Sequence, residues 1–276
     1  MVLYTNLELL KMMDFIPSHL QVLVLKVIKN LSMDSFNLDP LEKAGCVEKL
    51  CKLLSNDNGP HANDIKNQSL NALFYLCRIN KQRQEFACKY SLKALMDAAN
   101  TSSTLKQFAL PILSEFPTNK FCKKYINNEA TMIQYMNFLD DSNWVVNILE
   151  AIVSWCQEDL IFLESHLVGS TQKLVHAINT TRGQYFVGLL DCILKLCQLS
   201  DSISIAVSKN TELVKSLFEK VMIQKKPIAR VKILKILAEL VQHDAKLTSK
   251  QIDNLEQLER NDQAVLVKEL CHQILK

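Results

Sequence analysis

Apolar and polar positions follow the period of an α-helix along most of the chain. In residues 65–84, IKNQSLNALFYLCRINKQRQ, Leu70, Leu73 and Leu76 recur three residues apart, while Asn71 falls on the opposite side. This spacing predicts a helix with one broad buried face. Because such a helix needs neighbours that cover its apolar face, we expect related helices elsewhere in the chain.

Five other apolar stretches repeat this pattern. The equivalent last apolar positions are Leu31, Leu76, Phe116, Trp155, Leu196 and Leu240. By subtraction, the steps between them are 45, 40, 39, 41 and 44 residues. This period is typical of armadillo or HEAT repeats. We therefore predict an all-α, armadillo/HEAT-like right-handed α-solenoid of about six repeats, with residues 1–276 as a single domain and two amphipathic helices in 248–276 as a C-terminal cap.

Composition supports the all-α prediction. The chain has 276 residues and is 48% apolar, yet only 5 Gly and 6 Pro interrupt it. A sheet protein needs more turns, and no long run of alternating β-branched residues predicts a set of strands. The first fifteen residues read as an amphipathic helix, from which we expect the sequence to be a fragment of a longer protein.

The nine cysteines are expected in the core of a protein from a reducing compartment. They form no CxxC pair and have no histidine cluster at zinc-finger spacing. Most lie among apolar helical residues, where a reduced cysteine acts as a small hydrophobe. No stretch of eighteen apolar residues occurs either. These features predict a cytoplasmic protein without a metal, a cofactor or an integral membrane segment.

Charge is unevenly distributed although the net charge is only +3. Residues 125–172 contain seven acids and no Lys or Arg, whereas residues 209–235 contain eight bases and two acids. We expect a second basic binding zone there, formed by Lys225, Lys226, Arg230, Lys232 and Lys235. The alternative is that these residues are ordinary solvated faces of helices.

Residues 41–116 resemble a known repeat family. A short helix ending at Ala44 and Gly45, a helix closing on Leu53 and Leu54, and a long third helix have the order of an armadillo repeat, with Gly45 allowing the bend. The combination LEKAGCVEKLCKLL, IKNQSLNALFYLCRINKQRQEFA and LKQFALPILSEF resembles the armadillo-repeat region that follows the kinase domain in fungal septation and mitotic-exit kinases and in plant epsilon-type MAP kinase kinase kinases. The resemblance implies an interaction region located at the spindle pole body.

Catalytic motifs are missing from the sequence. None of its glycines forms GxGxxG, and the HRD, DFG, GxSxG and HExxH patterns do not occur. His166 and His176 could be drawn as metal ligands with Glu164, but isolated helical histidines are more often structural or solvated. We therefore predict no catalytic residues, and a kinase domain absent from this sequence.

Polar and basic residues of the second and third repeats form the predicted partner-binding zone. They are Asn67, Asn71, Tyr75, Arg78, Arg83, Lys106, Lys123 and Lys124. Arginine guanidinium groups bind phosphate oxygens in pairs, so a phosphorylated or acidic peptide is the expected ligand. The alternatives are ion pairs within the solenoid or solvation for the bases, and bonds to neighbouring loops for the two asparagines.

The resemblance implies a non-catalytic module that docks a septation or mitotic-exit kinase onto a scaffold protein, and the basic residues of the predicted partner-binding zone favour a phosphopeptide as the ligand. One alternative is self-association as a homodimer that regulates the kinase. Another is an anionic-lipid or nucleic-acid surface in residues 209–235. That segment lacks interleaved aromatic residues beyond Phe218, so no nucleic-acid partner is expected.

Overall fold

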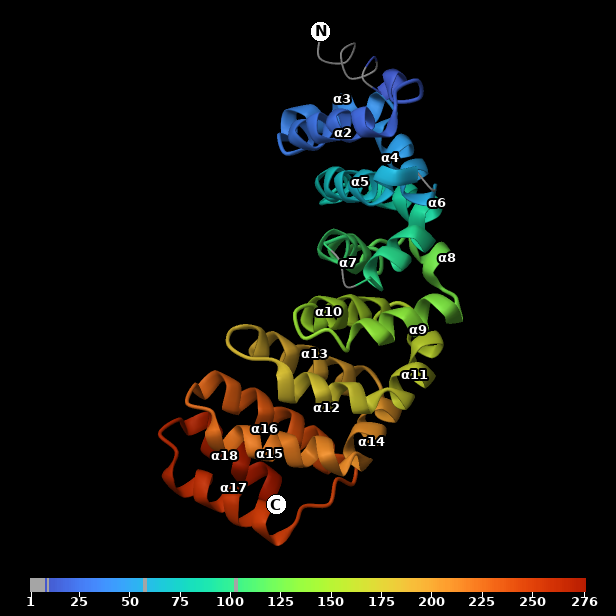
Figure 1. The fold of residues 1–276 in the computed structure, drawn as a ribbon. Coiled ribbons are helices and arrows are strands. Elements are labelled where there is room, and N and C mark those ends of the chain that lie inside the picture. Colours follow the sequence, from blue (N-terminus) through green and yellow to red (C-terminus); the bar gives the residue numbers. More distant parts are fainter. Residues whose placement is uncertain (1–7, 9, 57–58, 102–103) are drawn as a thin grey trace. The chain divides into compact units, whose positions relative to one another are not determined.

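The computed structural model describes residues 8, 10–56, 59–101 and 104–276, and these residues form helices and connecting turns without a strand (Figure 1). The all-α prediction is confirmed. The helices are α2 (Ser18–Ser32), α3 (Ser35–Lys43), α4 (Cys46–Ser55), the 3₁₀ turn η1 (Gly59–His61), α5 (Ala62–Cys77), α6 (Lys81–Ala99), α7 (Lys106–Glu115), α8 (Lys123–Ile126), α9 (Glu129–Phe138), α10 (Val145–Cys156), α11 (Leu160–Gly169), α12 (Thr171–Thr180), α13 (Tyr185–Leu199), α14 (Asp201–Lys209), α15 (Thr211–Ile223), α16 (Pro227–Gln242), α17 (Ser249–Asn261) and α18 (Val265–Leu275).

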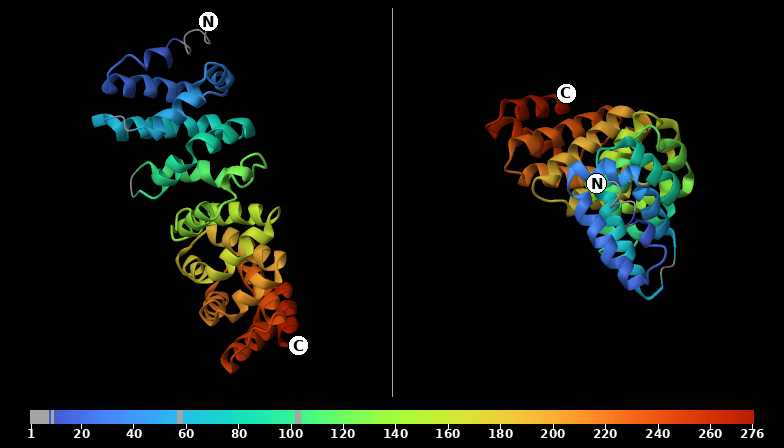
Figure 2. Two further views of the ribbon diagram at one scale, coloured as in Figure 1. Left: turned by 90° about the vertical axis from the view of Figure 1, so that its right-hand side faces the viewer. Right: turned by 90° about the horizontal axis from the view of Figure 1, so that it is seen from above.

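The chain divides into two compact units, Met1–Asn128 (unit 1) and Glu129–Lys276 (unit 2). In unit 1 the long helices α2, α5 and α7 pack on one another in sequence, and α4 packs on α6. Figure 1 and the left view of Figure 2 both show these helices as successive layers, coloured blue to green. Each layer buries the apolar face of the layer before it, which is how a repeat protein builds its core.

Unit 2 repeats the same arrangement. The long helices α10, α13, α16 and α18 pack in order, while α12 packs on α15 and α11 packs on α14. The core around α10 is aromatic: the fully buried Trp155 ring meets Tyr135 of α9 edge-on, with ring centroids 5.5 Å apart. Leu196 and Leu240, the equivalent positions of α13 and α16, are also buried, so the repeat deduced from the sequence coincides with the layers of the core.

Gly45 provides the bend between α3 and α4. Its φ is +81°, a left-handed conformation that glycine adopts without the steric penalty of a Cβ. The role predicted for this glycine is confirmed. Gly169, in contrast, ends α11 without a positive φ.

Residues 65–84 form two helices rather than one. Helix α5 ends at Cys77, and Asn80 caps α6 because its side chain accepts hydrogen bonds from the backbone N–H groups of Gln82 and Arg83. Helix α6 runs unbroken from Lys81 to Ala99, and no glycine interrupts it. The third repeat therefore has one long helix where the family pattern has two.

Helix α3 is capped by Asp34, whose side chain accepts a hydrogen bond from the N–H of Phe36, and Pro40 lies inside that helix. The amphipathic helix predicted over residues 1–15 lies largely outside the described residues.

A buried asparagine joins two layers of unit 1. Asn119, which is 1% exposed, donates from Nδ2 to the backbone carbonyl of Lys81 at 2.8 Å and to Gln84 Oε1 at 3.1 Å. Its own Oδ1 accepts from the N–H of Phe121 at 3.1 Å. One side chain therefore satisfies donors and acceptors on both sides of the α6–α8 junction, and such a buried network resists removal of any member.

All nine cysteines are buried free thiols. Burial raises the pKa of Cys46 and of Cys156 to about 12, because a thiolate would lose its hydration in the core. Within the described ranges, no helix is long and apolar enough to span a bilayer. Groups of three His, Cys, Asp or Glu side chains in metal-binding geometry are absent from the same residues.

Candidate functional site

A groove opens in unit 2 where the stacking of second helices stops. Helix α12 packs on one side of α15, but the next helix in line, α17, packs chiefly on α18. Only Leu255 of α17 is buried, so this helix buries little apolar surface of its own. One face of α15 is consequently left uncovered between α15, the end of α16 and the start of α17.

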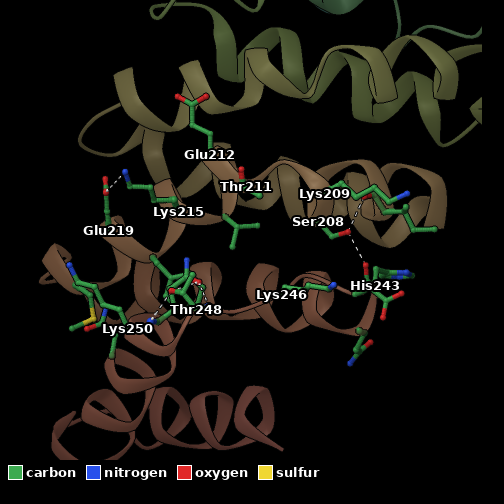
Figure 3. Close-up of a pocket in the computed structure, with 18 of the residues that line it drawn as sticks. Ser208, Lys209, Thr211, Glu212, Lys215, Glu219, His243, Lys246, Thr248 and Lys250 are labelled. Atoms are coloured by element: carbon green, nitrogen blue, oxygen red, sulfur yellow. Dashed lines mark hydrogen bonds and ion pairs between the residues drawn. The ribbon is translucent and has the colours of Figure 1, made fainter.

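The α15–α17 groove has a volume of about 1620 Å³ and an apolar floor (Figure 3). Val214 and Phe218 of α15 form the bottom of it, and both are nearly buried. Met222 and Ile223 continue the same helix face and are 36% and 68% exposed. Ile205 of α14 adds a further exposed apolar side chain. Met222, Ile223 and Ile205 therefore offer apolar surface that nothing in the described chain covers.

Backbone contacts hold the walls of the groove. Ser208 Oγ donates to the carbonyl of His243 at 2.8 Å and so ties α14 to the end of α16. Asp244 has φ +66°, which turns the chain sharply out of α16. Thr248 then caps α17 in a reciprocal pair with Gln251. The groove is thus framed by fixed helix ends rather than by a long loop.

The rim of the groove is basic. Lys209, Lys246 and Lys250 form no ion pair in the part of the chain that the structure describes. Lys215 lies 3.9 Å from Glu219 one turn away, and Glu212 accepts a hydrogen bond from Gln172 at 2.7 Å.

Figure 3 shows Glu212 pointing away from α16 and α17. Glu212 and Asp244 form no ion pair among the described residues, and Glu219 is the third acid of the lining. The groove therefore combines apolar floor and cationic rim, which suits a segment with apolar and acidic side chains.

Four residues of the predicted partner-binding zone lie together on α5 and at its C-terminal end. Asn67, Asn71 and Tyr75 occur at intervals of four residues and Arg78 follows at the C-cap, so the four share one stripe of the helix. Arg78 is exposed and the other three are half-buried. Asn67 Nδ2 donates to Thr104 Oγ1 at 3.3 Å, which is the alternative of a bond to a neighbouring loop.

Arg83 does not belong to that stripe. It is on α6, is 3% exposed, and donates from Nε to Glu42 at 2.7 Å and from Nη1 to the Leu76 carbonyl at 3.3 Å, with a further ion pair to Asp39. The expected ligand contact is replaced by an ion pair between layers. The reason is the helix break at residues 78–80, which turns Arg83 towards α3.

The three lysines predicted from the third repeat are dispersed. Lys106 begins α7 and is half-buried. Lys123 and Lys124 lie on α8, which packs on α6 rather than on α5. Lys124 forms an ion pair with Glu85 at 2.8 Å. Lys123 and Lys124 therefore do not extend the α5 stripe, whereas Lys106 lies on α7, which packs on α5.

The residues of the second basic zone do not form one surface either. Arg230 binds the buried Asp262 at 3.1 Å, and Lys232 forms an ion pair with Asp191. These two bases join neighbouring layers and are not available as a surface. Lys225 and Lys226, just before α16, are exposed, as is Lys235.

Sequence reasoning missed the groove itself. Its floor residues look like ordinary core positions, since Val214, Phe218 and Met222 have helical spacing. The available signal was the composition of residues 249–261, where a highly polar helix follows an apolar one. A helix with so little apolar surface cannot cover two neighbours.

The layers of short, second and long helices define an armadillo-type repeat protein, an all-α solenoid and not a kinase fold. A solved structure supports this class: a designed armadillo repeat protein in complex with the peptide (KR)4 matches 85% of this chain and 98% of its own, with TM-score 0.68 and 12% identity. No family model matches the sequence.

Curated relatives place the chain more narrowly. It is 31% identical over its whole length to the cytokinesis protein sepH of Emericella nidulans, 27% identical over 98% of its length to MAP3K epsilon protein kinase 2 of Arabidopsis thaliana, and 24% identical over 98% to cell division control protein 7 of Schizosaccharomyces pombe. The chain spans 21%, 21% and 26% of these proteins. It is thus a homologue of one region of these septation and cell-division proteins, and the resemblance deduced from residues 41–116 is confirmed over the whole chain.

Proposed function

We propose that this chain is a non-catalytic interaction region that docks a septation or mitotic-exit kinase onto a scaffold protein at the spindle pole body. The α15–α17 groove carries the proposal, because it is a large apolar surface with a fixed frame. The names of the relatives support the two other parts of the proposal. They point to cytokinesis and cell division as the process, and to a protein kinase as the protein that is docked. The armadillo-type fold supplies a general mode of action, the binding of extended or helical segments along a repeat surface.

The chemistry of the groove defines the partner. Side chains at Met222 and Ile223 require apolar anchors from the ligand, and each anchor that leaves water contributes about 1.5–3 kcal/mol. Lys209, Lys246 and Lys250 favour acidic residues beside those anchors. This preference is opposite in charge to the (KR)4 peptide of the designed structural neighbour. We expect an acidic segment with two or three spaced apolar residues.

Fluorescence anisotropy with overlapping peptides from the spindle-pole scaffold of the same organism tests the proposal. We expect at least one peptide to bind, and Met222→Glu or Ile205→Glu to weaken that binding about tenfold or more. Ile252→Glu is the matched control, since Ile252 is an exposed residue of α17 outside the groove. Binding of no peptide, or binding that ignores both groove substitutions, would refute the proposed docking.

The α5 stripe is a second contact surface for the same partner. Arg78→Ala removes its one fully exposed base while leaving the fold intact, because Arg78 makes no ion pair among the described residues. A loss of affinity for the scaffold peptide in this variant would place α5 in the interface. Unchanged affinity would restrict the interface to unit 2.

Self-association is a second candidate function, favoured by the surface of α2. Leu20, Leu23 and Val27 recur at helical spacing and are 39%, 54% and 45% exposed, on the side away from α5. A second copy of the chain could cover this stripe. Sedimentation velocity tests it: a dimer that Leu23→Glu with Val27→Glu converts to a monomer supports the idea, and a monomeric parent chain excludes it.

A further inference from the structure

A second, smaller pocket lies beside the α15–α17 groove at the start of α16. Its volume is about 410 Å³. Four bases from three segments line it: Arg182 from the α12–α13 turn, Lys220 from α15, and Lys225 and Lys226 from the α15–α16 turn. No acidic residue belongs to the lining. We call this site the basic pocket.

The bases of the basic pocket lack acidic partners. Within the described residues none of the four forms an ion pair, and the one hydrogen bond made by Arg182 goes from Nη1 to the carbonyl of Thr181 at 3.1 Å. Burial, reinforced by repulsion from Arg182 and partly offset by the neighbouring Glu219, lowers the pKa of Lys220 below its ordinary value. Lys220 Nζ lies over the Phe186 ring, 6.0 Å from its centroid. Four like charges around one cavity repel each other unless an anion enters it.

Two neutral features of the pocket also suit an anion. Thr181, which is 4% exposed and lines the pocket, has a buried hydroxyl with no hydrogen-bond partner among the described residues. A buried polar group of this kind is costly unless a partner arrives. The pocket also lies at the N-terminus of α16, a helix of 16 residues that starts with Pro227. The positive end of the helix dipole favours an anion there, although Pro227 has no N–H and the N–H of Ala229 is already bonded to the Lys226 carbonyl at 3.1 Å.

The basic pocket adjoins the α15–α17 groove. Ile223 lines both, so a chain lying in the groove reaches the pocket at the end of α15. A phosphate monoester supplies the charge of up to two and the several acceptor oxygens that four cations can use. We infer that the basic pocket binds the phosphate of a phosphoserine or phosphothreonine in the same protein segment that docks in the groove. The inference rests on the proposed docking function and adds a phosphate-reading subsite to it.

A small probe tests the pocket independently of any partner. We expect phenyl phosphate, added to the full chain at constant ionic strength, to shift backbone amide NMR signals of residues 181–187 and 220–229 saturably. Lys225→Ala with Lys226→Ala should abolish these shifts. The matched control is Lys195→Ala with Lys235→Ala, which removes the same charge from exposed sites outside the pocket. Absence of saturable shifts, or equal loss in the control, would overturn the phosphate site.

The source of the phosphate is tested with degenerate peptide libraries that carry a central phosphoserine or phosphothreonine, compared with unphosphorylated libraries. We expect the phosphorylated libraries to bind at least about tenfold more tightly, and the pocket double variant to remove the preference while the control double variant keeps it. Vesicles of phosphatidylcholine with phosphatidylinositol 4-phosphate form the other arm. If only these vesicles bind through Lys225 and Lys226, the inference that the phosphate belongs to the docked protein segment is refuted, and the pocket binds a lipid headgroup.

The outcomes separate the inference from the docking function. Scaffold peptides that need Met222 but show no phosphate preference would leave docking intact and remove the phosphate subsite. Phenyl phosphate binding together with no phosphopeptide preference would likewise contradict the inference, because the phosphate must come from the docked segment. If the phosphopeptide libraries bind but no scaffold peptide does, the result would instead contradict the identity of the partner.

Discussion

The ion pair of Arg83 with the preceding layer provides the sharpest test of the architecture of unit 1. Arg83 is 3% exposed, whereas the side chains of Asp39 and Glu42 are 78% and 37% exposed. The arginine is therefore buried, whereas both of its acidic partners are accessible to water. Removing the arginine leaves two acids that water can reach, but removing the acids leaves a guanidinium buried without a counter-charge.

The magnitudes follow from this asymmetry. An exposed pair such as that of Asp39 contributes only about 0–1 kcal/mol, and the bond to the buried Leu76 carbonyl contributes about 1–2 kcal/mol. With the half-buried Glu42 contact and lost packing, we expect Arg83→Ala to lower the free energy of unfolding by about 2–3 kcal/mol. Asp39→Ala with Glu42→Ala should lower it by about 3–5 kcal/mol, the usual penalty for stranding a buried charge.

Urea unfolding followed by circular dichroism measures these changes, together with native-state hydrogen exchange of the α5 and α6 amides, because a repeat chain can unfold in parts. Arg78→Ala is the control and should change the free energy of unfolding by less than about 0.5 kcal/mol. A double acid variant that is no less stable than Arg83→Ala would refute the reasoning. So would an Arg83→Ala chain that keeps its stability and loses phosphopeptide binding, because Arg83 would then be a ligand contact.

Three further outcomes follow from individual residues. Asn119→Ala should lower the free energy of unfolding by about 2–3 kcal/mol, since it leaves buried acceptors of α6 unsatisfied; a melting temperature unchanged within error would contradict this. Gly45→Ala should cost about 1 kcal/mol because of its left-handed backbone, whereas Gly169→Ala should be neutral or stabilising, and equal effects in urea titrations would contradict the assignment. The thiols of Cys46 and Cys156, with pKa about 12 when folded against 9.0 when exposed, keep their protons longer in the folded state. Stability should therefore fall as pH rises from about 9 towards 12, and the thiols should react with iodoacetamide only on unfolding; stability that rises over that window, or alkylation of the folded chain, would contradict their burial.

Much of the fold could be predicted because helix burial leaves a local pattern. The three-and-four spacing around Leu70 and Leu73 describes one face of one helix, and the recurrence of that pattern places Trp155, Leu196 and Leu240 in equivalent layers. Gly45 could also be assigned, since only a short-range requirement, a backbone with positive φ, decides that position. These properties depend on neighbours along the chain, which the sequence displays.

Tertiary structure decided the site. Arg83 leaves the α5 stripe because the chain breaks at residues 78–80 and then packs against α3, and Arg230 becomes structural because Asp262, 32 residues later, is brought against it. The groove exists because α17 packs on α18 and leaves α15 uncovered, and the basic pocket exists because three separate segments bring Arg182, Lys220 and Lys225 together. Each of these depends on which surfaces meet across long stretches of chain, and helical periodicity carries information only about which face of a helix is buried, not about what covers it.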